Sequence, residues 1–244
     1  MAASDTSTQI TPYHEKVGFY YLNFKPGSEL YNQRGVVVYE GFHSRTNRKI
    51  VAKRIRVYNK KEYVEMAENE ADILMNTPPH NNVIRVLNVI RENVPNSVPP
   101  EVDIFIIMEF GELGDLKKYA YQRDLNIDDK LNIMLQCALG LQHLHGLSPP
   151  VIHRDIKPQN IFIFGKSASP TAKLGDFGEA RFIEKKEDKT VSVHTYRGTE
   201  AYMAPELFTR PISAVTCLEI HPFKVKVCHF ISLSWQQVHH LCQQ

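Results

Sequence analysis

Short apolar runs broken by polar turns dominate the first 110 residues, and this pattern predicts β-strands. Between Tyr20 and Val57, β-branched and aromatic residues predict a strand meander, in which the clearest strands are "RGVVVYEGF" and "RKIVAKRIRV". Further on, "NVIRVLNVIREN" and "VDIFIIMEF" predict two more strands. Because the last segment is almost wholly apolar, we expect that strand to be buried.

Two segments predict helices. Asn59 and Glu62 resemble an N-terminal capping box that opens a helix ending near Met75. A longer amphipathic helix is predicted from Ile127 to about His145, because its apolar positions follow the roughly 3.6-residue period of a helix. Those positions are Ile127, Leu131, Met134, Leu135, Ala138 and Leu141.

The overall composition is that of an ordinary globular protein. The chain has 244 residues, with 29 basic and 27 acidic side chains, so its charge gives no reason to expect a nucleic-acid or anionic-membrane partner. The N-terminal segment lacks an apolar run of signal-peptide length, and no window reaches the roughly 18 apolar residues of a membrane helix. We therefore expect a cytoplasmic location, with the nucleus as the alternative.

The composition changes near Pro211. Residues 211–244 contain only three charged side chains, yet three of the four cysteines and the only tryptophan. A zinc site would be one interpretation, but the spacings lack the paired C-x2-C or H-x3-H of such sites, so reduced thiols are the simpler expectation. We interpret this tail as foreign to the preceding domain, as alternative splicing or a misassembled reading frame would produce.

Four short motifs follow one another between residues 153 and 206. They are His153-Arg154-Asp155, then Asn160, then Asp176-Phe177-Gly178, then Ala204-Pro205-Glu206. In this order and spacing, the sequence resembles the eukaryotic protein kinase family of the serine/threonine type, over residues 20–209. The resemblance implies an α+β fold with two lobes. The N-lobe would be an antiparallel sheet plus one helix, and the C-lobe would be mainly helical.

On this basis the chain divides into four parts. They are a disordered lead-in at 1–16, a kinase N-lobe at 17–108, a partial C-lobe at 109–210 that ends with the activation segment, and a divergent tail at 211–244. The C-lobe is expected to be incomplete, because no family pattern is recognisable after Glu206. Three apolar positions of the long helix would then stay partly uncovered: Leu131, Leu135 and Ala138.

The implied function is transfer of the ATP γ-phosphate, with Mg²⁺, to serine or threonine hydroxyls of protein substrates. The alternative is a catalytically impaired kinase-like binding or decoy module, since the lower C-lobe is not recognisable. A small-molecule phosphotransferase would use the same Asp and Asn residues, but it would not normally combine "DFG" with "MAPE".

Phosphoryl transfer depends mainly on alignment and on neutralising negative charge. By resemblance, Asp155 is the base that orients the substrate hydroxyl, and Lys157 reaches the transferring phosphoryl group. Asn160 and Asp176 supply hard oxygen ligands suited to Mg²⁺.

The N-lobe contributes a lysine and its acidic partner. Lys53 in "IVAKRI" would hold the α- and β-phosphates, on the face of the strand opposite Ala52. Glu70 is its implied partner, whereas the other glutamates of that helix fit a solvated face: Glu62, Glu65 and Glu68.

The segment "IIMEFGELGDL" resembles the hinge that binds adenine. Met108 would be the gatekeeper, and the backbone from Glu109 to Gly111 would hydrogen-bond the adenine edge. Three apolar side chains would enclose the purine: Val38, Ala52 and Phe162. Each of these three also fits an ordinary core position.

Two further features concern specificity and regulation. Lys157 and Thr199 favour serine/threonine specificity, and Arg154 beside Asp155 is typical of kinases that pair with a phosphate on the activation segment. The candidate phosphosites are Thr190, Ser192, Thr195 and Tyr196, and a phosphate there would imply an upstream activating kinase.

The glycine-rich loop departs from the family pattern. In "ELYNQRGVVVYEG" only Gly35 remains, one residue out of register with Val38. Glycines let backbone amides approach phosphates closely, so Tyr31, Asn32 and Gln33 are expected to weaken or reshape the nucleotide lid.

Overall fold

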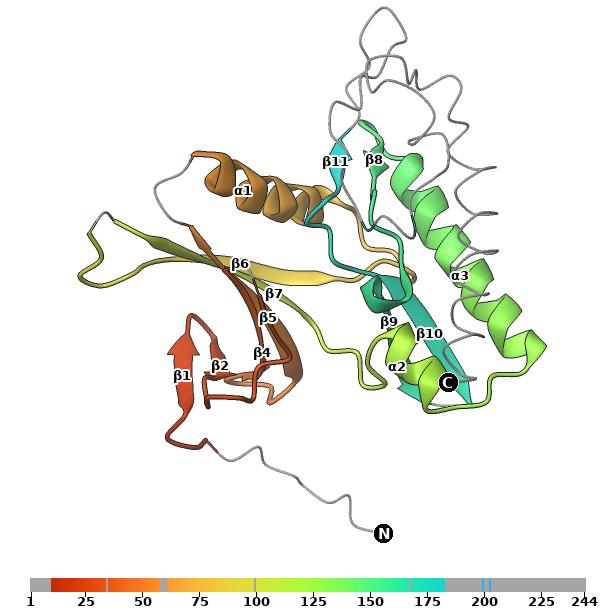
Figure 1. The fold of residues 1–244 in the computed structure, drawn as a ribbon, viewed down its shortest axis with the longest axis horizontal. Coiled ribbons are helices and arrows are strands. Elements are labelled where there is room, and N and C mark those ends of the chain that lie inside the picture. Colours follow the sequence, from red (N-terminus) through yellow and green to blue (C-terminus); the bar gives the residue numbers. More distant parts are fainter. Residues whose placement is uncertain are drawn as a thin grey trace, which may run out of the picture. The chain divides into compact units, whose positions relative to one another are not determined.

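The computed structural model describes residues 10–33, 35–57, 61–98, 100–166, 168–182, 199 and 202. The chain forms two compact units, of which the first comprises residues 1–75 with 85–110 and the second residues 76–84 with 111–244 (Figure 1). The described elements are strands and helices together, which confirms the predicted α+β class. In the described part of the chain, no helix has the length and apolar character needed to cross a membrane.

The first unit is an antiparallel sheet of seven strands. The strand order is β1-β2-β4-β5-β7-β6, and β3 also pairs with β4. The strands are β1 (His14–Val17), β2 (Tyr20–Asn23), β3 (Tyr31–Gln33), β4 (Val36–His43), β5 (Lys49–Val57), β6 (Val86–Asn93) and β7 (Val102–Glu109). The four strands named from the sequence correspond to β4, β5, β6 and β7, and β7 is buried as expected.

Strand register assigns the side chains of this sheet to two faces. Val38 pairs with Lys53, and Lys53 pairs with Ile106, so these three side chains share one face, the Lys53 face. The neighbouring row contains Ala52 and therefore points to the opposite face, the Ala52 face. A core cluster fills the Ala52 face: Val17, Tyr20, Leu22, Ile50, Ala52, Phe105 and Ile107.

An N-terminal hairpin covers part of the Ala52 face. Val17 pairs with Tyr20, so Gly18 and Phe19 form the two-residue turn, and the φ of +57° at Gly18 suits glycine. The first strand begins at His14, inside the stretch interpreted as a disordered lead-in. Pairing of all four β1 residues with β2 and burial of Val17 order this segment despite its polar composition.

A single glycine allows β2 to lie close against β4. A Cβ atom on Gly41 would lie 2.4 Å from the carbonyl oxygen of Tyr21 and 2.8 Å from the Leu22 side chain. No larger side chain fits at such distances, so β2 can lie this close to β4 only because residue 41 is glycine. The hairpin is therefore an integral part of the first unit.

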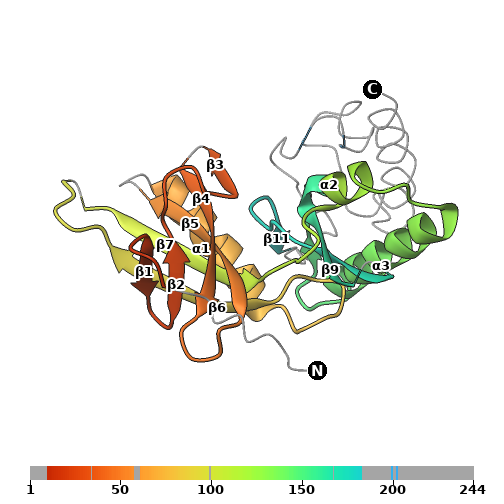
Figure 2. The ribbon, with the colours of Figure 1, turned by 90° about the horizontal axis from the view of Figure 1, so that it is seen from below.

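The helix of the first unit, α1 (Lys61–Asn76), lies against the sheet (Figure 2). Its end agrees with the predicted end near Met75, while the expected cap at Asn59 lies outside the described residues. The side chains that it buries are Ala67, Glu70, Ala71, Ile73 and Leu74. Glu68, in contrast, is exposed, as expected for a solvated position.

In its described residues, the second unit combines helices with paired short strands. The helices are α2 (Leu116–Tyr121), α3 (Ile127–His145) and the 3₁₀ turn η1 (Pro158–Asn160). The strands are β8 (Val151–Ile152), β9 (Ile161–Lys166), β10 (Ser169–Leu174) and β11 (Arg181–Phe182), and they pair as β9 with β10 and β8 with β11. The predicted long helix is confirmed in α3, which begins with a complete capping box between Asn126 and Asp129.

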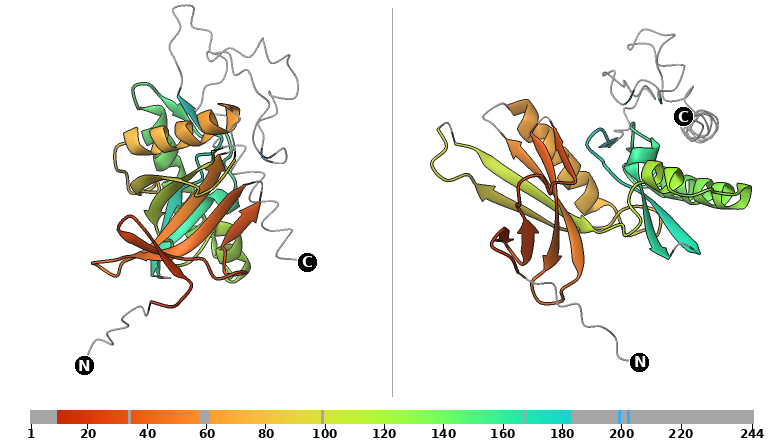
Figure 3. Two further views of the ribbon diagram at one scale, coloured as in Figure 1. Left: turned by 90° about the vertical axis from the view of Figure 1, so that its left-hand side faces the viewer. Right: turned by 60° about the horizontal axis from the view of Figure 1, so that its bottom comes forward.

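The two sides of α3 differ. Figure 3 shows the ribbon of α3 beside the strands of the second unit. The side of α3 that packs against β10 buries Ile133, Cys137, Gly140, Leu141 and Leu144. Burial raises the pKa of the Cys137 thiol to about 12, so this thiol stays protonated and unreactive. The other side exposes an apolar stripe: Ile127, Leu131, Leu135 and Leu139. Leu131 and Leu135 are thus uncovered, as expected from the sequence.

Candidate active site

A buried ion pair lies on the Lys53 face of the first unit. The Nζ atom of Lys53, on β5, donates to both carboxylate oxygens of Glu70, on α1, at 2.7 and 2.8 Å. Only 11% of the Lys53 side chain and 4% of the Glu70 side chain are exposed. Both charges are satisfied at close range, which is what allows them to be buried. The structure therefore brings together the lysine and glutamate that the motif paired.

One residue predicted to contact the purine lies on the wrong side of the sheet. Ala52 packs in the Ala52 face and is fully buried there. Val51 lies two residues before Lys53 on β5, so the two side chains share a face. Val51 also pairs with Met108 on β7. Val51 therefore replaces Ala52 as the residue beside the gatekeeper position. Strand alternation alone predicts this, because residues i and i+2 share a face.

Val38 and Met108 both lie on the Lys53 face of the sheet. Val38 is opposite Lys53 on the Lys53 face, and Met108 is buried beside Val51. The next residue, Glu109, is anchored to Arg85: its carboxylate accepts from the Arg85 amide at 2.8 Å, and its own amide donates to the Arg85 carbonyl at 3.2 Å. The Glu109 amide is therefore already engaged in the fold.

The second unit places two of the predicted purine contacts together. A Cβ atom on Gly111 would lie 3.4 Å from the Cβ atom of Phe162, so the Gly111 backbone lies beside the start of this side chain. Phe162 is half-buried on β9, and it forms a backbone bridge with Asp115. The Phe162 ring itself lies close to Gly175, where a Cβ atom would be 2.7 Å from the ring.

Asp155 is the centre of a hydrogen-bond network in the second unit. Its Oδ1 atom accepts from the amide and the hydroxyl of Thr199 at 2.9 and 2.8 Å, and its Oδ2 atom lies 2.7 Å from Lys157 Nζ. Lys157 Nζ also donates to the Thr199 hydroxyl at 2.7 Å. Asn160 Nδ2 donates to the Asp155 carbonyl and to Oδ2, both at 2.8 Å. Each carboxylate oxygen is therefore oriented by at least two donors.

These contacts determine the charge state of Asp155. Burial raises the pKa of this carboxyl, but the hydrogen bonds from Lys157 and Thr199, the Lys157 charge and the Asn160 amide together hold it below its ordinary value. Asp155 is therefore ionised at neutral pH, and it is ready to accept a hydrogen bond from a hydroxyl group.

His153 supports the loop from within the core. It is almost fully buried, its Nε2 atom lies 2.9 Å from the Gly175 carbonyl, and its ring lies 4.8 Å from that of Phe177. The Asp155 amide donates to His153 Nδ1 at 3.4 Å, which leaves the ring proton on Nε2 for Gly175. This histidine therefore links the loop of Asp155 to the loop of Asp176.

Two oxygen donors lie next to this network. Because Asn160 Nδ2 is engaged with Asp155, the amide oxygen is the atom that remains to bind a cation. The Asn160 carbonyl accepts from the Gly175 amide at 2.9 Å, and the following residue, Asp176, has a φ of +56°. Such a conformation is costly and is typical of functional sites.

The donor set of Asn160 and Asp176 fits Mg²⁺. Within the described part of the chain, no group of three or more His, Cys, Asp or Glu side chains could bind a metal by itself. Mg²⁺ is commonly held by one or two carboxylate-type oxygens, with water and phosphate completing its shell. An amide oxygen beside a single carboxylate is such an arrangement.

Some predictions fall on residues that the structure does not describe. They concern the phosphosites at Thr190, Ser192, Thr195 and Tyr196, the motif Ala204-Pro205-Glu206, and the tail at 211–244. Arg154, by contrast, is described: its φ is +67°, and its Nε atom donates to the Glu179 carbonyl.

Comparison with known proteins agrees with the motifs. A family model described as "Protein kinase domain" matches residues 33–216. The chain is 32% identical to serine/threonine-protein kinase atg1 of Dictyostelium discoideum over 200 residues, which cover 80% of this chain and 28% of that protein. It is also 32% identical to serine/threonine-protein kinase Nek5 of Mus musculus over 185 residues, which cover 69% and 27%. The chain thus spans less than a third of the length of these relatives.

Proposed function

Because the chain belongs to the eukaryotic protein kinase family, serine/threonine type, we propose that it transfers the γ-phosphate of ATP to serine and threonine hydroxyls of protein substrates. The observation that supports this most strongly is the environment of Asp155. Its carboxylate is ionised and is oriented by Lys157, Thr199 and Asn160. A buried carboxylate whose pKa is lowered by such a network is typical of functional sites.

In the proposed reaction, Asp155 accepts a hydrogen bond from the substrate hydroxyl and then its proton. Lys157, whose Nζ atom lies 2.7 Å from Asp155, provides a positive charge for the phosphoryl group that is transferred. The Thr199 hydroxyl donates to Oδ1 of Asp155, and Lys157 and Asn160 bind Oδ2, so both carboxylate oxygens are held in one orientation. Positioning and charge, rather than covalent chemistry, account for most of the catalysis in this class of reaction.

Each unit, taken by itself, carries residues proposed to bind the nucleotide. Lys53, held by Glu70, is the cation for the α- and β-phosphates. Asn160 and Asp176 would hold Mg²⁺, which neutralises negative charge on the phosphates when it is bound. Val38, Val51 and Met108 form the apolar surface offered to the purine by the first unit, and Gly111 and Phe162 form that of the second.

A second candidate is a kinase-like binding module with impaired catalysis. One observation favours it: Gln33 pairs with Val36, so only residues 34 and 35 connect β3 and β4 where the family has an open glycine-rich loop. Such a tight turn offers fewer backbone amides to the phosphates. The first candidate requires transfer of phosphate to a substrate, and the second requires only ligand binding.

The setting of the protein is also a proposal. The proposed location is the cytoplasm, and the balanced charge of the printed sequence favours protein substrates rather than nucleic acid or membrane as partners. An upstream kinase acting on the segment between Thr190 and Tyr196 is the proposed activator.

The direct test is phosphate transfer by the whole chain. Purified protein is incubated with γ-labelled ATP, Mg²⁺ and a generic protein substrate, beside an Asp155→Ala variant, and labelled phosphoamino acids are identified. We expect phosphoserine and phosphothreonine with the unaltered chain, and a rate lower by about 10²- to 10⁴-fold in the variant, as for loss of a general base. ATP binding without transfer would select the binding module, and label on tyrosine alone would contradict the serine/threonine assignment.

A further inference from the structure

The hairpin formed by β3 and β4 has a geometry unlike an open phosphate loop. Gln33 pairs with Val36, and Gly35, with a φ of +79°, occupies the turn. The Gly35 carbonyl accepts a hydrogen bond from the amide of Arg56, on β5, at 3.2 Å. The turn is thus tied to the sheet on two sides. A ligand that meets this hairpin meets strand side chains rather than a cradle of loop amides.

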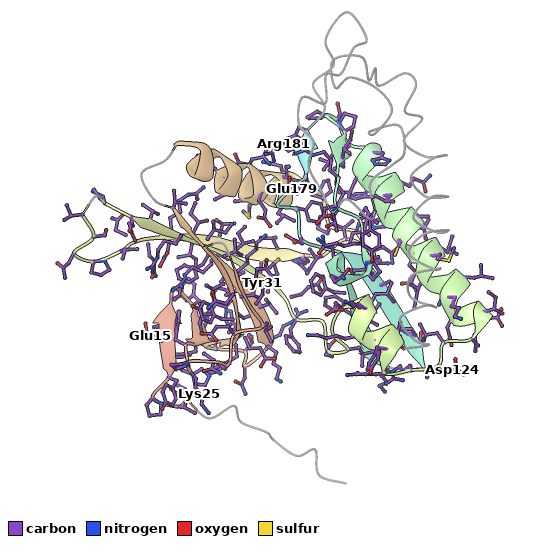
Figure 4. All side chains as sticks on the ribbon, viewed as in Figure 1. Glu15, Lys25, Tyr31, Asp124, Glu179 and Arg181 are labelled. Carbon is purple, nitrogen blue, oxygen red and sulfur yellow. The ribbon has the colours of Figure 1, made fainter. Side chains whose placement is uncertain are left out.

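Strand register identifies the side chain that faces such a ligand. Tyr31 pairs with Val38, and Val38 pairs with Lys53, so the three side chains form one row on the Lys53 face. Residues directly opposite each other on antiparallel strands have Cβ atoms about 5 Å apart, so Tyr31 lies about 10 Å from Lys53 along this row. Figure 4 labels Tyr31 among the strands of the first unit.

The burial along this row changes in one direction. Lys53 is nearly buried, Val38 is half-buried, and Tyr31 is 47% exposed. The neighbouring positions Asn32 and Val37 point to the opposite face, where Val37 is buried. Tyr31 is therefore a large, flat and accessible ring at the edge of the face that holds the lysine.

We propose that Tyr31 is a nucleotide-binding residue whose ring packs against the sugar and base of ATP, in place of the backbone amides of a glycine-rich loop. This inference rests on the proposed function. Tyr31 pairs directly with Val38, which is assigned to the purine, and it is one pairing further from Lys53, which is assigned to the phosphates. Aromatic rings bind nucleobases tightly, because each base has a flat face on which a ring can stack.

The test compares four forms of the full chain: unaltered, Tyr31→Ala, Tyr31→Phe and Tyr13→Ala. Tyr13 is a matched control, because it is 49% exposed, belongs to the same unit, and lies in the turn before β1. Equilibrium dissociation constants are measured for Mg-ATP and for adenosine, and the thermal midpoint of each form is recorded without ligand.

We expect Tyr31→Ala to weaken both ligands by about tenfold, because loss of a stacking contact acts on the nucleoside that the two ligands share. Tyr31→Phe is expected to stay within about twofold, since the ring is retained, and Tyr13→Ala to match the unaltered chain. The thermal midpoints distinguish a lost contact from a damaged hairpin.

Three results would overturn the inference. They are an affinity of Tyr31→Ala within about twofold of the unaltered chain, weaker binding of ATP but not of adenosine, and an equal loss in Tyr13→Ala. If the unaltered chain bound neither ligand, the proposed function would fail together with the inference. If the unaltered chain bound both ligands and Tyr31→Ala bound them equally well, the inference alone would fail.

Discussion

The sheet of the first unit and the α3 helix of the second unit are packed differently. The sheet has apolar cover on both faces, from α1 on the Lys53 face and from the N-terminal hairpin on the Ala52 face. The α3 helix buries one side against β10 and exposes Leu131 and Leu135 on the other. The Lys53–Glu70 pair therefore lies between a sheet and a helix that pack against each other. Asp155, in a loop, is positioned by specific hydrogen bonds.

The packing of the sheet also shows that the first unit extends beyond the residues that the family model matches. The match begins at residue 33, whereas Val17, Tyr20 and Leu22 belong to the same core cluster as Ala52. A chain that started at residue 33 would expose this cluster. Residues before the matched range are thus required to bury Ala52, which lies within that range.

The largest expected effect is on stability, from Leu22→Ala. This side chain is fully buried in the cluster, so the substitution is expected to lower the free energy of unfolding by about 2 to 5 kcal/mol. Chemical denaturation followed by circular dichroism measures this change. The same substitution at Leu135, which is 59% exposed on α3, is the control and should change the value by less than about 0.5 kcal/mol. Equal losses at the two positions would invalidate the comparison.

A smaller effect is expected from Gly140→Ala, which tests the buried side of α3. A Cβ atom there would lie 2.5 Å from the Asn82 carbonyl oxygen and 3.0 Å from the Leu174 side chain. Alanine favours helices over glycine by about 1 kcal/mol, and overpacking costs about 1 to 3 kcal/mol. We therefore expect a net loss of about 1 kcal/mol in denaturation experiments. A gain in stability would show that α3 is loosely packed on both sides.

The smallest effect concerns the pH dependence of stability. The pKa of Asp155 is lowered in the folded chain, so its ionised form adds stability above the ordinary carboxylate pKa of about 3.9. This contribution is lost as the pH falls through the lowered pKa. The gap in thermal midpoint between the unaltered chain and Asp155→Asn should thus be constant from pH 7 to about pH 5 and should narrow below about pH 4. A gap that widened on acidification would contradict the network around Asp155.

Local patterns predicted a large part of the fold. The bounds of α3 follow from its apolar period, and the buried strand β7 follows from its apolar composition. The Lys53–Glu70 pair followed from the resemblance, and burial then separated Glu70 from the exposed Glu68. These features depend on residues close in sequence or on a motif with fixed spacing.

Features that depend on pairing between distant strands were harder to predict. Ala52 was assigned to the purine, although alternation from Lys53 places Val51 there. The hairpin before residue 24 was partly missed, because its polar positions face solvent and resemble a disordered lead-in. The placement of Tyr31 required the register of β3 with β4, which the loop sequence alone does not determine.

The most direct test of the account separates binding from transfer in the two units. Mg-ATP affinity and phosphate transfer are measured for the full chain, for Lys53→Met and for Asp155→Asn. We expect Lys53→Met to weaken both, because it removes the cation for the phosphates. Asp155→Asn should retain Mg-ATP binding and slow transfer by about 10²- to 10⁴-fold, because only the acceptor for the hydroxyl proton is lost. Transfer by Asp155→Asn at the rate of the unaltered chain would contradict the assignment of Asp155 as the catalytic carboxylate.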